Sequence, residues 1–247
     1  MFSRMRLGSK SMLFGHLEPI IGDPGTLSQI ERVEASSDRK NSMSIRAVIV
    51  DLGGVLLNIP DIKNRYTKWE TRLQLQPGEL HLILRQAGFF ADADAGGFSE
   101  QGMVFRLGMI LGFNEEQALE FLRDLEAQKE LNQDMAAFLR SLRPPYKTAI
   151  LSNAWPGARK QYARYQFEEL VDTVIYSCEE GIAKPEPAIY HLAYQRLGVT
   201  PEGAVFLDDV EDFVEGARRL GMRAVLFQHT AQAITDVQAY LDDPLGI

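Results

Sequence analysis

Residues 47–56, Ala-Val-Ile-Val-Asp-Leu-Gly-Gly-Val-Leu, decide the fold of this chain. Four apolar, mostly β-branched residues run directly into an aspartate, a pattern typical of a strand buried on both faces of a parallel sheet. Asp51 stands at the predicted end of this strand, and the two glycines that follow allow the backbone to turn sharply or to approach a ligand closely. Because open α/β sheets bind ligands beyond the carboxyl ends of their strands, Asp51 is a candidate nucleophile or metal ligand.

The composition is that of an ordinary globular protein, with 45% hydrophobic and 24% charged residues among 247. This length suits one large domain, or a domain with a sizeable insertion. The formal net charge of −8 argues against a nucleic acid or an anionic membrane surface as the main partner. Cys178 is the only cysteine, so no internal disulfide can form, and we expect a reducing, cytoplasmic compartment. No apolar run is long enough to span a bilayer.

Residues 1–44 differ from the rest of the chain. They have no sustained helical or strand period, and 36–42 form a polar run, so we expect a disordered N-terminal extension. Met43 stands directly before the first predicted strand and would itself make a normal start. On this alternative, residues 1–42 would be a translational or annotation extension.

The segment 60–143 shows helical periodicity and little strand character. Its apolar residues predict helices near 66–75, 80–84, 100–111, 115–125 and 135–142. Ser99 and Asn114 are the expected N-caps of the third and fourth helices. We expect 92–97 to form a loop in which Asp92 and Asp94 are solvated rather than bound to a metal.

An alternation of strands and helices begins at residue 148. Strands are predicted at 148–151, 173–176, 204–207 and 223–227, with helices near 188–197 and 214–220. Such an alternation gives a parallel sheet with right-handed crossovers. The predicted fold class is therefore α/β, a Rossmann-like parallel-sheet core formed by 45–59 and 144–247 with an all-helical insertion at 60–143.

Polar side chains follow several of these strands, at or just beyond the point where each strand ends: Asp51, Ser152 with Asn153, Lys184, and Asp208 with Asp209. The carboxyl ends of parallel strands meet at one edge of a sheet, so these groups can share one pocket. Carboxylates and backbone carbonyls suit a hard cation such as Mg²⁺. A hydroxyl, an amide and an ammonium can hold a phosphoryl group, and Lys184 would keep Asp51 ionised for attack.

In these residues the chain resembles the haloacid dehalogenase (HAD) superfamily, over nearly everything between Ile45 and Phe227. The four motifs of that family are matched in order by the residues Asp51-Leu52-Gly53-Gly54-Val55, Ser152, Lys184-Pro185 and Asp208-Asp209. The helical insertion after the first motif matches the family's cap, which closes over the site and selects substrates. The resemblance is strongest to small bacterial phosphatases with a glycine at the third position of the first motif, among them glucose-1-phosphate phosphatases.

The resemblance implies a Mg²⁺-dependent hydrolase of small phosphate esters that works through an aspartyl-phosphate intermediate. It implies the catalytic residues Asp51, Ser152 and Lys184, and it implies Mg²⁺ held by Asp51, the main-chain carbonyl of Gly53, and Asp208 or Asp209. The implied substrate-binding residues are Gly53, Gly54, Ser152, Asn153 and Lys184. The expected partner is a small phosphorylated molecule, and the expected assembly is a monomer or a homodimer.

Gly53 departs from the family pattern, because typical family phosphatases carry a second aspartate there as general acid and base. Such a group is worth ~10²–10⁴ in rate. We therefore expect a slow enzyme, a restriction to good leaving groups, or a replacement from the cap, where Glu70, His81 and Glu100 are candidates. Phe213 also stands where many relatives have a polar residue, which weakens the expected support for the metal.

Three alternatives stay open. A dehalogenase would work without Mg²⁺ and would not need Asp208 and Asp209. A phosphonatase would need a lysine from the cap, such as Lys63 or Lys68. A catalytically weak HAD-fold protein would bind a phosphorylated ligand or a protein partner, and it would differ from an enzyme in whether Asp51 becomes phosphorylated.

Overall fold

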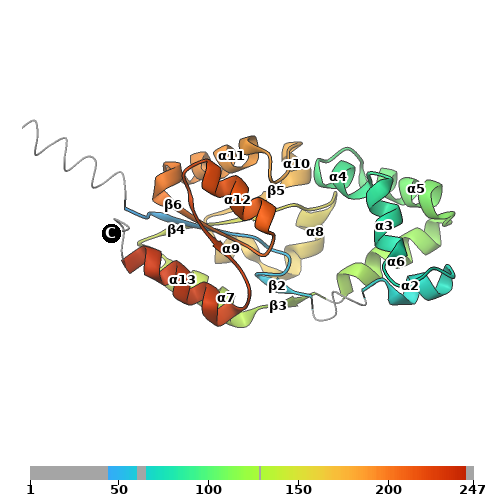
Figure 1. Cartoon of the computed structure of the whole chain (residues 1–247), viewed down its shortest axis with the longest axis horizontal. Coiled ribbons are helices and arrows are strands. Elements are labelled where there is room, and N and C mark those ends of the chain that lie inside the picture. The colour runs from blue at the N-terminus through green and yellow to red at the C-terminus, as the bar shows by residue number, and fades with distance from the viewer. Residues whose placement is uncertain (1–43, 60–64, 128, 243–247) are drawn as a thin grey trace, which may run out of the picture. The chain divides into compact units, whose positions relative to one another are not determined.

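The computed structural model describes residues 44–59, 65–127 and 129–242, all within the compact unit Lys40–Ile247. Its centre is a five-stranded parallel sheet with the strand order β5-β4-β1-β6-β7 (Figure 1). The strands are β1 (Ala47–Val50), β4 (Lys147–Ser152), β5 (Thr173–Tyr176), β6 (Ala204–Asp208) and β7 (Arg223–Leu226). The predicted α/β class with a parallel sheet is thereby confirmed.

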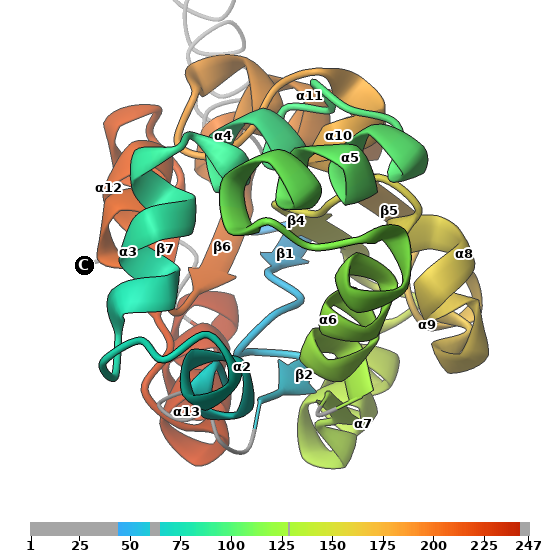
Figure 2. The same ribbon diagram turned by 90° about the vertical axis from the view of Figure 1, so that its right-hand side faces the viewer.

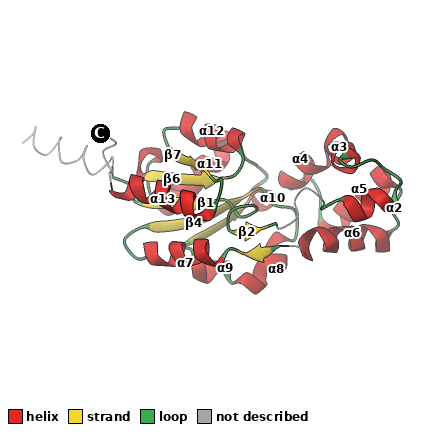
Figure 3. Ribbon diagram, turned by 60° about the horizontal axis from the view of Figure 1, so that its bottom comes forward, coloured by secondary structure: helices red, strands yellow, loops and turns green. Residues whose placement is uncertain are grey.

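The central strand β1 is buried along its whole length because helices cover both faces of the sheet (Figure 3). Ala47 and Ile49 face one hydrophobic cluster, while Val48 and Val50 face the other, as the two-residue period of a strand requires. The helices α11 (Pro187–Leu197) and α12 (Glu211–Arg219) supply the first cluster. The helices α7 (Gln133–Leu142), α9 (Phe167–Leu170) and α13 (Thr230–Asp242) supply the second. The short helices α8 (Ala158–Tyr162) and α10 (Ser177–Glu180) follow β4 and β5.

The inserted segment forms a helical cap beyond one end of the sheet, and Figure 2 shows its helices in front of that end. The helices are α2 (Thr67–Arg72), α3 (Glu79–Gln86), α4 (Phe89–Asp94), α5 (Glu100–Leu111) and α6 (Glu115–Ala127). They enclose a separate hydrophobic cluster in which the rings of Trp69, Phe113 and Phe121 contact one another at 5.0–6.0 Å between centroids. A two-stranded antiparallel ribbon, β2 (Leu57–Asn58) with β3 (Glu130–Leu131), joins the cap to the core.

Both predicted N-caps of the cap helices are confirmed. The Ser99 hydroxyl accepts a hydrogen bond from the Gly102 backbone N–H at 3.0 Å. The Asn114 side chain accepts one from the Gln117 backbone N–H at 2.9 Å. Each cap satisfies one of the backbone donors that a helix start leaves unpaired.

The expected loop at 92–97 is wrong in its first half, because α4 continues to Asp94. Gly88 adopts a left-handed φ of 71°, which lets a new helix begin directly after α3. Phe89 and Ala93, one turn apart, are both fully buried in the cap cluster and hold the helix in place. The acidic residues of this stretch led to the prediction of a loop, although its apolar residues form one face of an amphipathic helical turn.

The helix α7 lies inside the segment expected to be the insertion, yet it packs with the core. Its buried side chains, from Met135 to Leu142, belong to the cluster beneath the sheet together with α9 and α13. We propose that the cap ends at the β2–β3 ribbon rather than at residue 143. The core would then comprise everything from α7 onward, together with 45–59.

The expected disorder of residues 1–44 concerns a stretch that, apart from Ser44, lies outside the described residues, and so does Lys63. Within the described ranges, no helix is both long enough and apolar enough to cross a bilayer.

Candidate active site

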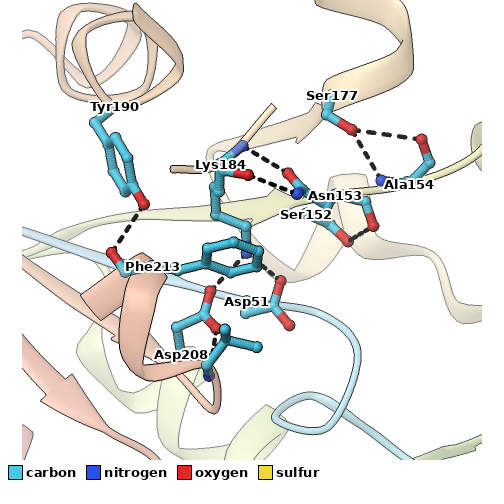
Figure 4. A network of polar contacts seen from close by, with 10 residues as sticks. Asp51, Ser152, Asn153, Ala154, Ser177, Lys184, Tyr190, Asp208 and Phe213 are labelled. Carbon is cyan, nitrogen blue, oxygen red and sulfur yellow. Dashed lines mark hydrogen bonds and ion pairs between the residues drawn. The ribbon is translucent and has the colours of Figure 1, made fainter. Parts of the chain in front are cut away.

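Lys184 links two carboxylates at the centre of the site (Figure 4). Its ammonium donates to Oδ1 of Asp51 and to Oδ2 of Asp208, each at 2.6 Å, and its side chain is 1% exposed. The register of the sheet creates this arrangement, because β1 and β6 are neighbours with Val50 opposite Leu207. The residues that follow these partners therefore leave the sheet side by side.

A third carboxylate joins this pair. Oxygen atoms of Asp51, Asp208 and Asp209 all lie within 4.8 Å of one another. Burial raises the pKa of Asp208 to about 7, although the charge of Lys184 opposes the shift. Burial and the charge of Asp51 raise the pKa of Asp209 to about 6. Burial disfavours the charged form of Lys184, but the two carboxylates outweigh this effect and raise its pKa.

This donor set fits a divalent cation. Three close carboxylates face one ammonium, so the cluster carries excess negative charge that a hard cation with oxygen ligands would offset. Both oxygens of Asp208 already accept hydrogen bonds, Oδ2 from Lys184 and Oδ1 from the Val210 backbone N–H at 2.9 Å. Asp209 is exposed towards the cavity described below. Asp51, Asp208 and Asp209 are therefore the side chains that would hold a metal.

The two glycines after Asp51 differ in what they permit. Gly54 has a left-handed φ of 86°, and a Cβ there would collide with the Asp209 carboxylate, so only glycine fits. Gly53 has open space, since a Cβ at that position would meet no atom within 4 Å. A side chain could therefore start from position 53 without meeting a neighbouring atom at its Cβ.

Ser152 ends β4 and Asn153 follows it, and the Asn153 side chain points towards the backbone of Lys184 (Figure 4). The Ser152 hydroxyl donates to the Asn153 carbonyl at 3.3 Å. The Asn153 side chain donates to the Lys184 carbonyl at 3.0 Å and accepts from the Lys184 backbone N–H at 2.8 Å. Ser177 holds the same loop, because its hydroxyl accepts from the Ala154 backbone N–H at 2.9 Å. No sequence pattern indicated this contribution from Ser177.

A family model described as a haloacid dehalogenase-like hydrolase matches residues 45–221, well over half of the chain. The chain belongs to this family. It is 45% identical over 214 residues to a phosphatase of Mycobacterium tuberculosis, an alignment that covers 77% of the chain and 90% of that protein.

A second relative is much longer than this HAD-like hydrolase. The chain is 29% identical over 227 residues to the bifunctional epoxide hydrolase 2 of Sus scrofa and spans only 39% of that protein's length. A solved HAD family enzyme of Bacteroides thetaiotaomicron, in complex with magnesium and inorganic phosphate, shares the fold with a TM-score of 0.63 and 21% identity. That alignment covers 74% of this chain and 94% of the other.

Aromatic rings enclose the lysine of this HAD-like hydrolase. The Lys184 ammonium lies 5.0 Å from the centroid of the Phe213 ring and 5.6 Å from that of Phe206, within the range of cation–π attraction. The Tyr190 hydroxyl donates to the Phe213 carbonyl at 2.8 Å and fixes that segment (Figure 4). The phenylalanine that replaces a polar residue therefore shields the buried ammonium from water.

A cavity of about 280 Å³ lies between the site and the cap. On the core side it is lined by Gly53, Asn153 and Asp209. Towards the cap, its lining includes Arg65, Glu126, Lys129, Trp155, Gln161 and Tyr162. No local pattern in the sequence singles out these residues. Arg65, Glu126 and Lys129 reach the site because the cap docks over it, whereas Trp155, Gln161 and Tyr162 come from the core segment after β4. A leaving group attached to a phosphoryl group at Asp51 would enter this cavity.

None of the three cap residues that we expected as acid candidates lines this cavity. Glu70 accepts from the Gly78 backbone N–H at 2.7 Å and so holds the turn before α3. The His81 ring lies 5.1 Å from Phe90 and 5.8 Å from Tyr66. Glu100 begins α5 and lies beside Gly157.

Three further cap residues, Lys68, Asp94 and Asp92, differ in how far they are exposed to solvent. Lys68 is exposed and pairs with Glu120 at 2.9 Å and Asp124 at 2.7 Å, so it is engaged outside the cavity. Asp94 is not a solvated residue as expected. Burial raises its pKa to about 6, the charge of Lys184 opposes this shift, and its carboxylate accepts a hydrogen bond from Trp155. Asp92 is exposed, in agreement with the expectation.

Proposed function

We propose that this HAD-like hydrolase is a Mg²⁺-dependent phosphatase that acts on small phosphate esters through an aspartyl-phosphate at Asp51. The observation that carries the proposal is the cluster of three carboxylates and one buried lysine that opens onto the cavity beneath the cap. The phosphatase among its relatives and the magnesium and phosphate in the Bacteroides enzyme support the same assignment. Its compartment, which we expect to be the cytoplasm, and its assembly as a monomer or homodimer stay predictions.

Asp51 has one oxygen available for attack. Oδ1 is bound to Lys184, and within the described part of the chain no hydrogen bond reaches Oδ2. In the proposed reaction Oδ2 forms a bond to phosphorus while the bond from phosphorus to the ester oxygen breaks. Water then attacks phosphorus, which releases phosphate and restores the Asp51 carboxylate. Two easier steps thus replace one difficult one.

The other residues hold the phosphoryl group and balance its charge, which is most of what phosphoryl transfer requires. Lys184 keeps Asp51 ionised, and Ser152, with the backbone at Gly53 and Gly54, would orient the phosphoryl oxygens. Mg²⁺, held by Asp51, Asp208 and Asp209 with the Gly53 carbonyl, would supply positive charge beside the ester. Asn153 would act mainly by fixing Lys184, because both ends of its amide are engaged there.

The absence of a carboxylate at Gly53 shapes the expected substrate range. No acidic side chain at this position protonates the leaving oxygen, so esters with good leaving groups, such as anomeric, acyl or aryl phosphates, should react fastest. Glucose 1-phosphate is an anomeric phosphate, and the resemblance to glucose-1-phosphate phosphatases makes it one of the substrates to test.

The alternatives receive less support from the geometry. A dehalogenase would not need the buried excess of carboxylates at Asp208 and Asp209. A phosphonatase needs a neutral cap lysine. Lys129 lines the cavity and pairs with Glu126 at 2.6 Å, yet burial lowers its pKa, so this lysine keeps the phosphonatase alternative open. A binding protein without turnover would leave Asp51 unphosphorylated.

The test is release of phosphate from p-nitrophenyl phosphate and a panel of sugar phosphates, with Mg²⁺ and with chelator. Asp51→Asn is the test variant, and Asp92→Asn, an exposed aspartate of the cap, is its matched control. We expect release that needs both Mg²⁺ and Asp51 and that survives in the control. No such release from any ester would overturn the proposal, and 2-haloacids and phosphonates would then be assayed.

A further inference from the structure

Arg65 lines the active-site cavity and carries a buried nitrogen without a hydrogen-bond partner among the described residues. Among the described side chains, the buried nitrogen atoms without a hydrogen-bond partner are Nε of Arg65 and Nε of Arg106. Only Arg65 lines the cavity that also contains Gly53 and Asp209. A buried donor without a partner is destabilising, and an arginine held in this state is suited to receive an acceptor from a ligand.

The described residues contain no counterion for Arg65. No described carboxylate lies within ion-pair distance of its guanidinium, and its Nη2 reaches only the Leu125 carbonyl, at 3.4 Å. The nearby Glu126 is already engaged, because Lys129 donates to it at 2.6 Å and also to the Tyr162 hydroxyl at 2.6 Å. Among the described charged residues that line the cavity, Arg65, Lys129 and Glu126 lie on the cap side and Asp209 lies on the core side. Because Asp209 would hold the metal, Arg65 is the cation that an anion of the substrate would balance.

Arg65 lies where its charge can contact the part of the substrate beyond the phosphoryl group. The cavity is bounded by Gly53, Asn153 and Asp209 on one side and by Arg65 and Lys129 on another. Asp51 stands two residues before Gly53, which lines this cavity, so an ester bound at Asp51 would extend into the space that Arg65 also lines. The volume of about 280 Å³ lies below the ~300–1,000 Å³ typical of sites for drug-sized ligands, so the alcohol part of the ester must be small.

We propose that Arg65 binds a second anionic group on the substrate, and that the preferred substrates are small phosphate esters whose alcohol part carries a carboxylate or a second phosphate. This inference rests on the proposed phosphatase function and narrows it. A guanidinium binds a carboxylate or a phosphate through two parallel hydrogen bonds, which fixes the orientation of the ligand as well as its charge. Lys129, held by Glu126 and Tyr162, lines the same cavity as Arg65.

The test compares esters that differ only in the second anion. 3-Phosphoglycerate and glycerol 3-phosphate have the same carbon chain, with a carboxylate in one and a hydroxymethyl group in the other. Glycerol 1,3-bisphosphate, which keeps the same carbon chain and the hydroxyl at C2, tests a phosphate as the second anion. The quantity measured is kcat/KM for each ester with Mg²⁺, expressed as the ratio of the anionic ester to the neutral one.

We expect the wild-type protein to favour an anionic ester by at least about tenfold, with the two anionic esters showing which anion is preferred. Arg65→Met should lower this ratio by about 10–100-fold, the value of a hydrogen bond to a charged group. Arg65→Lys should restore part of it. Arg106→Met is the matched control, because Arg106 carries the other unpaired Nε outside the cavity, and it should leave the ratio unchanged.

A second measurement does not depend on turnover. Isothermal titration of the Asp51→Asn protein with 3-phosphoglycerate should detect binding that weakens on adding Arg65→Met. Equal kcat/KM values for the anionic and neutral esters, or equal losses for both in Arg65→Met, would overturn the inference. Loss of all Mg²⁺-dependent release, p-nitrophenyl phosphate included, would instead overturn the proposed function, so the two failures are distinguishable.

Discussion

Asn153 holds the backbone of Lys184 through both ends of its side-chain amide. Its Nδ2 donates to the Lys184 carbonyl at 3.0 Å, and its Oδ1 accepts from the Lys184 N–H at 2.8 Å. These two bonds join the loop after β4 to the loop after α10, which are 31 residues apart in the chain. The ammonium that contacts Asp51 and Asp208 therefore depends on an amide that contacts neither.

Replacing this amide should impair the reaction more than substrate binding. In Asn153→Ala the two backbone groups of Lys184 lose their partners, and each unsatisfied buried group is worth ~1–3 kcal/mol. We expect kcat for p-nitrophenyl phosphate to fall about tenfold or more with a smaller change in KM, measured with saturating Mg²⁺. Asn153→Asp keeps the acceptor but loses the donor. Its kcat should therefore lie between the kcat of the wild-type protein and that of Asn153→Ala. Equal effects on kcat and KM in both variants would contradict a positioning role.

Gly53→Asp should restore the general acid that typical relatives possess. The site has room for a side chain, since a Cβ at Gly53 meets nothing within 4 Å. We expect kcat for alkyl phosphates, whose leaving oxygen needs a proton, to rise by about tenfold or more, within the range known for general acid catalysis. The rate with p-nitrophenyl phosphate should change little, because its leaving group departs unprotonated.

Gly53→Asn is the control for this gain. It has nearly the same shape as aspartate but carries no carboxyl proton. An equal gain in the asparagine variant would show that shape, rather than proton transfer, changes the rate. No gain in the aspartate variant would mean that another group already protonates the leaving oxygen.

The fold and the core of the site were predictable because they depend on local sequence. The apolar run before Asp51 had to be a buried central strand, and the parallel sheet had to bring the ends of β1 and β6 together. The close contact of Asp51, Lys184 and Asp208 follows from this topology, although their catalytic roles stay predictions. Periodicity within single segments was sufficient for these features.

The cap side of the site was not predictable in the same way. Arg65 and Lys129 reach the cavity only because the cap docks over the sheet, and no local pattern encodes that relation. The sequence held a partial signal for one contact of this region. Glu126 and Lys129 are three residues apart, a spacing that allows an ion pair, and they form one in the structure. Asp94 was missed because its acidic surroundings resembled a loop, whereas Phe89 and Ala93 bury the helix that carries it.

Mg²⁺ should stabilise the fold, and Asp209 should be required for this effect. A cation that binds only the native state stabilises it by about 2.7 kcal/mol at 100 times its dissociation constant. We expect the unfolding midpoint of the wild-type protein to rise with added Mg²⁺ and that of Asp209→Asn to rise much less. In chelator the variant should be the more stable of the two, because it removes one of three carboxylates within 4.8 Å. An equal Mg²⁺ response in both proteins would exclude Asp209 as a ligand.

Asp94 should make stability depend on pH. Its pKa is raised from 3.8 to about 6 by burial, against the opposing charge of Lys184 and the hydrogen bond from Trp155, with Asp51 adding to the rise. Because the native state binds this proton more tightly than the unfolded state, the ionised carboxylate destabilises the fold above pH 6. The destabilisation fades as the pH falls from about 6 towards 4.

Asp94→Asn removes the charge but keeps an acceptor for Trp155. At pH 7.5 in chelator, we expect its free energy of unfolding, measured by urea denaturation, to exceed that of the wild-type protein by roughly 1–3 kcal/mol, given ~1.4 kcal/mol per pKa unit. This difference should shrink towards zero near pH 4. Asp92→Asn, an exposed residue of the same helix, is the control and should show no comparable trend. A difference between wild type and Asp94→Asn that stays constant from pH 4 to 7.5 would show that Asp94 titrates alike in the folded and unfolded states.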